Sequence, residues 1–95
     1  MPTIRRRIID LLSEQEMTAR DLSQALSIME KEVYSHLEHI DRSIARQQKK
    51  LVVVPFACLL CGFSFAARKK WTRPGRCPLC KEGHVGPAWY RIVPL

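Results

Sequence analysis

All four cysteines of the chain lie in two Cys-X-X-Cys pairs, and this spacing is its strongest chemical signal. The residues between the pairs are 62–76. Each pair places two sulfurs on one side of a tight turn, and a hairpin between the turns brings four thiolates into a tetrahedron. The pattern predicts one structural zinc ion per chain, held by Cys58, Cys61, Cys77 and Cys80. Two disulfides are the alternative use of the same cysteines.

The remaining candidates for chemistry give no sign of catalysis. Three histidines, His36, His39 and His84, are potential metal ligands, but four cysteines already complete a tetrahedral site, so we expect structural or surface roles for them. No cysteine is left as a nucleophile. The sequence contains neither a serine–histidine–acid signature nor a phosphate-binding glycine loop. We therefore expect that the protein is not an enzyme.

Length and composition indicate a small folded protein in the cytoplasm. The chain has 95 residues and is 46% hydrophobic, which suits one domain or two very small ones. It contains no apolar run of about 18 residues, so we expect no membrane-spanning helix and no membrane partner. The apolar run behind the basic residues 5–7 is too short for a signal peptide. A reducing cytoplasm would keep the thiols free to bind metal.

The positive charge is concentrated in the half of the chain that holds the cysteines. The formal net charge is +7, and residues 51–95 contribute seven basic side chains against one acidic side chain. An excess of this kind favours a polyanionic partner, of which nucleic acid is the commonest.

The first half of the chain predicts three helices. Thr3 is a candidate cap for the first, and Thr18 with Asp21 resembles a capping box for the second, which runs to about residue 26. A third, longer helix is expected over residues 29–46. The apolar positions at helical spacing are Ile4, Ile8, Leu11 and Leu12 in the first helix, Leu22, Ala25 and Leu26 in the second, and Val33, Leu37, Ile40 and Ile44 in the third.

Two strand candidates follow the helices and flank the cysteine segment. Residues 51–54 are rich in valine, and residues 88–93 are the second candidate. If they pair, the chain is an α+β winged helix-turn-helix, with three helices plus a β-wing and a four-cysteine zinc ribbon inserted in the wing. The predicted domains are a winged helix over 1–57, completed by 88–95, and a ribbon over 58–87. A three-helix bundle without a role in DNA binding is the plainer alternative.

Four segments carry a family resemblance. They are T-A-R-D-L-S-Q-A-L-S-I (18–28) with Val33 and His36-Leu37 after it, the knuckles C-L-L-C-G (58–62) and C-P-L-C (77–80), and A-W-Y-R-I-V (88–93). In these the chain resembles small prokaryotic predicted transcriptional regulators that join a winged helix-turn-helix to a rubredoxin-like zinc ribbon. It differs at Met29, where such proteins usually have Ser or Thr. The resemblance implies DNA binding, and rubredoxin-like knuckles also hold iron, which makes iron the alternative metal.

Two groups of side chains are candidate nucleic-acid contacts. Outward positions of the third helix offer Lys31, Tyr34, Ser35 and Arg42, although four acids accompany them on that helix. The ribbon hairpin offers Arg68, Lys69, Lys70, Arg73 and Arg76. A basic run is commonly only a solvated face, but these five have no acid among them.

The functional hypothesis is a DNA-binding transcriptional regulator whose partner is double-stranded DNA. The first alternative is a protein-interaction module of the transcription machinery, with RNA polymerase or another transcription protein as its partner. The second is a rubredoxin-like electron carrier, against which the basic charge argues because rubredoxins are typically acidic. The sequence leaves the oligomeric state open.

Overall fold

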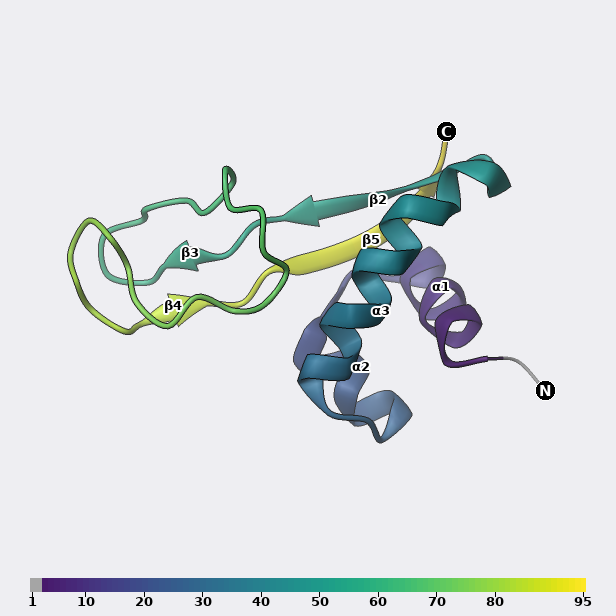
Figure 1. Cartoon of the computed structure of the whole chain (residues 1–95), viewed down its shortest axis with the longest axis horizontal. Coiled ribbons are helices and arrows are strands. Elements are labelled where there is room, and N and C mark those ends of the chain that lie inside the picture. Colours follow the sequence, from purple (N-terminus) through teal and green to yellow (C-terminus); the bar gives the residue numbers. More distant parts are fainter. Residues whose placement is uncertain (1–2) are drawn as a thin grey trace.

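The computed structural model describes residues 3–95, with the helices at one end of an elongated molecule and the cysteines at the other (Figure 1). Its principal extents are 44 × 29 × 20 Å. In chain order the elements are α1 (Ile4–Glu14), β1 (Met17–Thr18), α2 (Ala19–Leu26), α3 (Glu30–Ser43), the 3₁₀ turn η1 (Ile44–Gln47), β2 (Lys49–Val54), β3 (Ala57–Cys58), β4 (Val85–Gly86) and β5 (Trp89–Pro94). No helix in the described part of the chain is long and apolar enough to cross a bilayer.

Both predicted helix caps are confirmed. The Thr3 hydroxyl accepts a hydrogen bond from the Arg6 amide at 3.2 Å and begins α1. Thr18 begins α2 with a reciprocal capping box: the Thr18 hydroxyl accepts from the Asp21 amide, and the Asp21 carboxylate accepts from the Thr18 amide. These bonds satisfy amides that have no partner within the helix, so the sequence sets both starting points locally.

The third helix differs from its prediction at both ends. Met29 occupies the N-cap position, and its side chain makes no capping hydrogen bond. The regular helix stops at Ser43, three residues before the predicted end, and tightens into η1. Gln48 then adopts a left-handed conformation (φ 62°), which turns the chain into β2.

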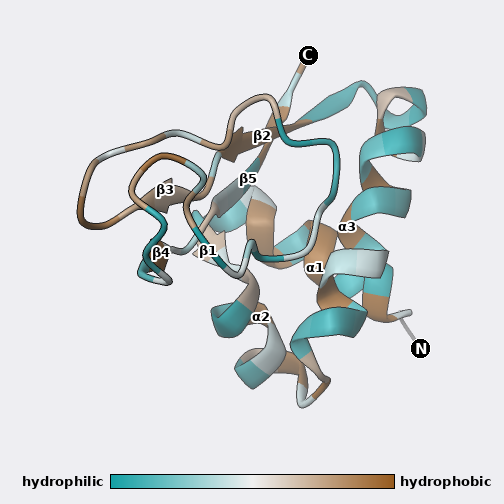
Figure 2. Cartoon of the chain, turned by 60° about the vertical axis from the view of Figure 1, so that its left-hand side comes forward, coloured by the Kyte–Doolittle hydropathy of each residue, from teal (hydrophilic) through white to brown (hydrophobic). Residues whose placement is uncertain are grey.

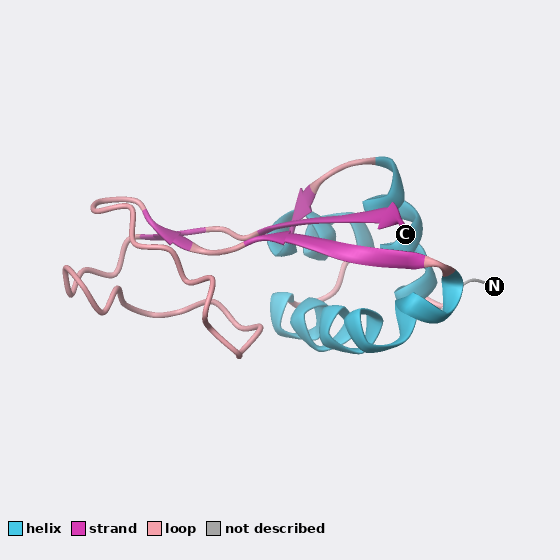
Figure 3. Cartoon of the chain, turned by 90° about the horizontal axis from the view of Figure 1, so that it is seen from above, coloured by secondary structure: helices cyan, strands magenta, loops and turns pink. Residues whose placement is uncertain are grey.

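The predicted pairing of the two strand candidates, 51–54 and 88–93, is confirmed. Strands β2 and β5 run antiparallel, with Leu51 opposite Ile92 and Val54 opposite Trp89. The sheet has the order β1-β5-β2, and β1, which pairs Met17 with Tyr90, was not predicted. The strands reach from the helices toward the cysteine end (Figure 3), where β3 and β4 form a second, two-stranded sheet.

The main core lies between the helices and the inner face of the sheet, as the apolar interior in Figure 2 indicates. The predicted set needs four corrections: Ala25 is exposed, Ile4 and Leu11 are half-buried, and Ile9, which was not in the set, is buried. The most completely buried side chains are Ile8, Leu12, Leu22, Val33, Leu37, Ile40, Ile44 and Tyr90.

The cysteine segment is joined to this core as well as to the strands. Buried Val85 belongs to the core cluster, and half-buried Phe65 and Trp71 pack against it. The loop that contains Trp71 therefore turns back toward the helices instead of staying at the far tip of the molecule. The division into 1–57 with 88–95 and 58–87 stays a prediction.

Candidate metal centre and candidate nucleic-acid interface

The four cysteine sulfurs form one compact cluster at the end opposite the helices. All four lie within 4.8 Å of one another. The Sγ atoms of Cys58 and Cys80 are 3.5 Å apart, and those of Cys61 and Cys77 are 3.6 Å apart. A disulfide needs about 2.05 Å, whereas tetrahedral zinc with bonds of about 2.3 Å places its sulfurs about 3.8 Å apart. The thiols are free and their spacing fits a four-coordinate metal ion.

The two knuckles repeat the same backbone pattern. The amide of Cys58 donates to the Phe63 carbonyl, and the amide of Cys77 donates to the Glu82 carbonyl, both at 2.9 Å. Four residues after each first cysteine, an amide donates back to the carbonyl of that cysteine, from Gly62 at 3.0 Å and from Lys81 at 2.9 Å. The knuckles are therefore equivalent halves of one site.

These turns force a left-handed backbone at matching positions. Gly62 has φ 78°, as the sequence indicates, and Lys81 has φ 67°. Glycine accepts this conformation freely, whereas a lysine pays a steric cost. The Lys81 conformation was not predicted because no glycine or asparagine marks it.

Backbone amides stabilise negative charge on the first sulfur of each knuckle. The amides of Cys61 and Leu60 donate to Cys58 and lower the pKa of its thiol to about 6. Burial raises the pKa of Cys77, but the amides of Cys80 and Leu79, with the neighbouring thiols, outweigh it and lower the value overall.

The second cysteine of each knuckle, Cys61 or Cys80, has a thiol whose pKa is raised. The Phe63 amide favours the Cys61 thiolate, but burial and the thiols of Cys77 and Cys58 raise the pKa overall. The Glu82 amide likewise favours the Cys80 thiolate. Burial and the other three sulfurs outweigh it and raise the pKa of Cys80 to about 12. Four thiolates this close repel one another, so a cation among them would stabilise the fully ionised set. The donor set therefore fits a structural metal ion.

The histidines lie outside this cluster. His36 on α3 accepts a hydrogen bond from the Arg5 side chain at 3.2 Å, and the metal-competent group contains cysteines only. His84 is exposed beside β4, where its carbonyl accepts from the Leu59 amide.

Within the basic loop, defined here as residues 66–76, two arginines hold the backbone in place. Arg68 donates to the carbonyl oxygen of Thr72 at 3.1 Å and to its hydroxyl at 3.4 Å. The Arg73 guanidinium donates to the Val85 carbonyl. Arg68 and Arg73 therefore use part of their hydrogen-bonding capacity within the protein. Lys69, Lys70 and Arg76 are exposed.

On α3 the structure corrects the prediction for Tyr34. Its side chain is only 8% exposed and its ring lies 6.4 Å from that of Phe56, so it belongs to the core and does not face outward. Burial raises the pKa of its phenol. Arg42 is exposed but forms an ion pair with Glu38 at 3.0 Å. Lys31 and Ser35 are exposed as predicted.

The two groups of candidate contacts meet along one groove, which we call the α3–loop groove. Lys31, Ser35 and Glu38 line its α3 side, together with the largely buried Tyr34. The other side is formed by Lys69, Lys70, Trp71 and Thr72. The sequence placed the basic residues on a distant hairpin, but two of them lie beside the outward face of α3.

A family model described as "PF0610-like, N-terminal" matches residues 3–52, which is more than half of the chain. The chain belongs to the PF0610-like family. A solution NMR structure of protein PF0610 from Pyrococcus furiosus is similar to the whole fold, with a TM-score of 0.78 and 25% sequence identity. The match covers 97% of this chain and 90% of that one. None of the curated proteins matches the chain.

Sequence reasoning missed the residue that joins the two ends of this PF0610-like chain. Trp71 stacks on Tyr90 of β5, with ring centroids 6.4 Å apart and planes 25° apart, and it lines the α3–loop groove. The available signal was a large aromatic residue within a basic run. Such a residue rarely stays in solvent, and it indicates that the loop has a packing partner.

Proposed function

We propose that the protein is a DNA-binding transcriptional regulator and that its duplex-binding face is the α3–loop groove. The observation that carries this proposal is the convergence of Lys31 and Ser35 with Lys69 and Lys70 on that groove. Three helices followed by the β2–β5 pair support a winged helix-turn-helix, with α3 as the recognition helix. The basic loop would then occupy the place of a wing beside that helix.

The charges on this face favour phosphate contacts from three lysines. Lys31, Lys69 and Lys70 form no ion pair with any residue in 3–95. Of the nearby acids, Glu38 is already paired with Arg42. Long side chains with free ammonium groups reach phosphates easily, while Ser35 is short enough to contact a base edge.

The metal centre would act on DNA binding indirectly. The basic loop lies between Cys61 and Cys77, so the metal ion would fix the segments on both sides of it. Within the loop, Arg68 and Trp71 then hold the lysines against α3. In this proposal the ion is structural zinc and takes no part in chemistry.

The test uses duplexes selected from a random pool and measures affinity as a function of salt concentration. Three phosphate contacts give a slope of log affinity against log salt near −2.7, from about −0.9 per contact. Changing Lys69→Gln and Lys70→Gln together should bring the slope to about −0.9. The matched control is Lys49→Gln with Lys50→Gln, a lysine pair of equal charge at the far end of β2, which should leave the slope unchanged.

Two results would overturn this assignment. Equal losses in the two double variants would mean that only net charge matters. Failure to select any duplex at low salt would remove DNA as the partner.

A second candidate is a protein-interaction module of the transcription machinery. The observation in its favour is the exposure of three knuckle leucines, Leu59 (71%), Leu60 (60%) and Leu79 (67%), at the cysteine end. Exposed apolar side chains gathered at one end are common in protein interfaces. Changing Leu60→Ser and Leu79→Ser should abolish capture of RNA polymerase if this candidate is correct, and should leave DNA affinity unchanged if the first one is.

A further inference from the structure

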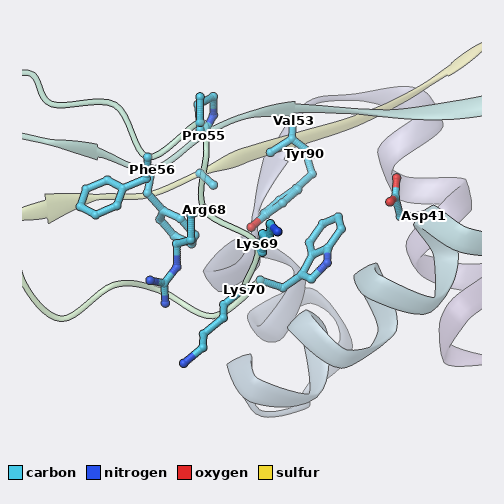
Figure 4. A pocket seen from close by; sticks show the side chains of 12 residues that line it. Asp41, Val53, Pro55, Phe56, Arg68, Lys69, Lys70 and Tyr90 are labelled. Carbon is cyan, nitrogen blue, oxygen red and sulfur yellow. The ribbon is translucent and has the colours of Figure 1, made fainter.

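Beside the α3–loop groove lies a second concavity, which we call the aromatic hollow, with a volume of about 300 Å³ (Figure 4). It opens between β2, the basic loop and the last turns of α3. Four aromatic side chains contribute to its lining. They are Phe56, Phe65, Trp71 and Tyr90.

The aromatic lining suits a flat ring. Trp71 and Tyr90 already stack at 25°, and the aliphatic side chain of Val53 adjoins them from β2. Phe65 is held from its far side by an edge contact to Phe63, with ring centroids 5.1 Å apart. Fixed aromatic faces bind planar rings through offset stacking at little cost in entropy.

The charged lining suits an anion. Arg68, Lys69 and Lys70 approach the aromatic hollow from the basic loop, whereas Asp41 of α3 is the one acid among its lining residues. In Figure 4 Lys69 and Lys70 come from the loop segment that borders the aromatic rings, and the Lys70 side chain extends away from them. The ring of a ligand would therefore contact apolar surface, and its charged substituent would contact the basic side chains. Small-molecule sites usually combine an apolar lining with a few polar groups in this way.

We propose that the aromatic hollow binds a small planar aromatic anion, one or two rings bearing a carboxylate or a phosphate. Its volume is near the lower limit of about 300 Å³ for ligand pockets, which restricts the ring system to that size. The ring packs against Trp71 and Phe65, and the negative group pairs with Lys69 and Lys70. A free aromatic acid and a mononucleotide both have this chemistry.

The same site gives the proposed regulator a means of sensing this ligand, and this step rests on the proposed function. Lys69, Lys70 and Trp71 line both the aromatic hollow and the α3–loop groove, so they form a wall shared by the two. A ligand anion that pairs with one lysine removes it from a DNA phosphate. At 0.1 M salt the loss of one contact lowers DNA affinity about eightfold.

Ligand binding is tested without DNA, by amide chemical shifts of the full metal-loaded chain. The probes are 2-naphthoate, the neutral 2-naphthamide, the non-aromatic cyclohexanecarboxylate, and AMP. We expect 2-naphthoate to bind at least about tenfold more tightly than either single-feature analogue, because each lacks one of the two interactions. Tighter binding of AMP would identify a nucleotide as the source of the ring and the anion. Equal affinity for the amide and the naphthoate, or shifts centred away from Lys69–Trp71, would overturn the proposal.

Variants locate the site and separate it from DNA binding. Ala66 also lines the aromatic hollow, so Ala66→Trp should fill it and abolish naphthoate binding, with thermal unfolding as the check that the chain stays folded. The Lys69→Gln, Lys70→Gln pair should weaken binding about tenfold, and the Lys49→Gln, Lys50→Gln pair should not. Saturating naphthoate should lower DNA affinity of the unmodified chain but not of Ala66→Trp. Naphthoate binding that leaves DNA affinity unchanged would refute the regulatory link alone, and absence of DNA binding would refute only the proposed function.

Discussion

At the scale of single residues, Gly62 and Lys81 occupy equivalent places in the two knuckles and share a left-handed backbone. A Cβ added at Gly62 would meet nothing within 4 Å, so its replacement acts through conformation alone. Gly62→Ala should lower the free energy of unfolding by about 1 kcal/mol, and Lys81→Gly should raise it by about 0.5 to 1 kcal/mol. Chemical denaturation of the metal-loaded protein measures both. Equal effects of the same sign would contradict the equivalence of the two turns.

His36 gives the helical end a pH dependence of its own. Burial and the nearby Arg5 guanidinium lower the pKa of His36 from its ordinary value of 6.5, with Glu32 opposing and His39 assisting the shift. Since the folded state disfavours the protonated form, the His36 contribution to stability is complete above the ordinary value. It is lost as the pH falls below 6.5 toward the lower folded pKa.

The expected result is therefore a difference between the native chain and His36→Gln. Below pH 6.5 the native chain should lose more stability than the variant, which has no group titrating there. Urea unfolding between pH 5 and 8 (about the range in which histidine titrates) measures this. The variant retains both other histidines and all four cysteines, so their titration cancels in the comparison. Parallel curves would contradict the lowered pKa of His36, to which burial contributes most and Arg5 next.

Tyr34 shows why residue positions could be predicted on one side of α3 and not on the other. The 3.6-residue period places Val33 and Leu37 inward, and both are fully buried. Tyr34 lies beside that stripe, and it is buried because Phe56, which follows β2, packs against its ring. No periodic pattern marks Phe56, so nothing in the sequence signals that this side of α3 is covered.

At the scale of elements, β5 completes the helical core from the far end of the sequence. Tyr90 and Ile92 face inward, 1% and 3% exposed, whereas Val52 on the opposite face of the sheet is 40% exposed. Ile92→Ala should destabilise the protein by about 2 to 5 kcal/mol because it leaves a cavity beneath the helices. Val52→Ala should change stability by about 0.5 kcal/mol or less. Thermal unfolding followed by the helical signal gives both values, and similar losses would contradict this assignment of faces.

Elements that are set by residues near in sequence could be predicted. Elements that form only because a distant segment packs beside them could not. Thr3 and Thr18 begin helices through bonds to amides three residues away, and the pairing of β2 with β5 follows from two apolar runs of similar length. By contrast, β1 is only Met17–Thr18, and it exists because β5 arrives beside it. The cysteine spacing fixed the composition of the metal site but not the path of the loop between the knuckles.

At the scale of the whole molecule, the basic loop connects the cysteine end to the helices. Phe65 and Trp71 pack against the core cluster that the helices share with β5, and Arg73 holds the loop to β4 through the Val85 carbonyl. A metal ion held by the four cysteines would therefore position side chains that lie well away from it. Metal loss should be detected at Trp71 as well as in the knuckles, and under the proposed function it should also weaken DNA binding.

Removal of the metal, either by a chelator or by Cys80→Ser, should affect the two ends of the molecule differently. We expect one ion per chain, colourless if it is zinc and red if it is iron, measured by elemental analysis and visible absorption. Without it, the helical circular dichroism should persist, because the core residues Ile8, Leu22 and Ile40 come from α1, α2 and α3. Tryptophan fluorescence should shift to longer wavelength as Trp71 leaves Tyr90.

The unfolding midpoint of the helices should also fall, because the loop no longer covers their core. A matched control is Gly75→Ala, an exposed position between the knuckles where an added Cβ meets nothing within 4 Å, and it should retain the ion, the fluorescence and the midpoint. Complete loss of the helical signal would mean that the two ends form a single cooperative unit. An unchanged fluorescence spectrum would mean that Trp71 holds its place on Tyr90 without the metal, and the basic loop would then owe its position to the arginine bonds and aromatic packing alone.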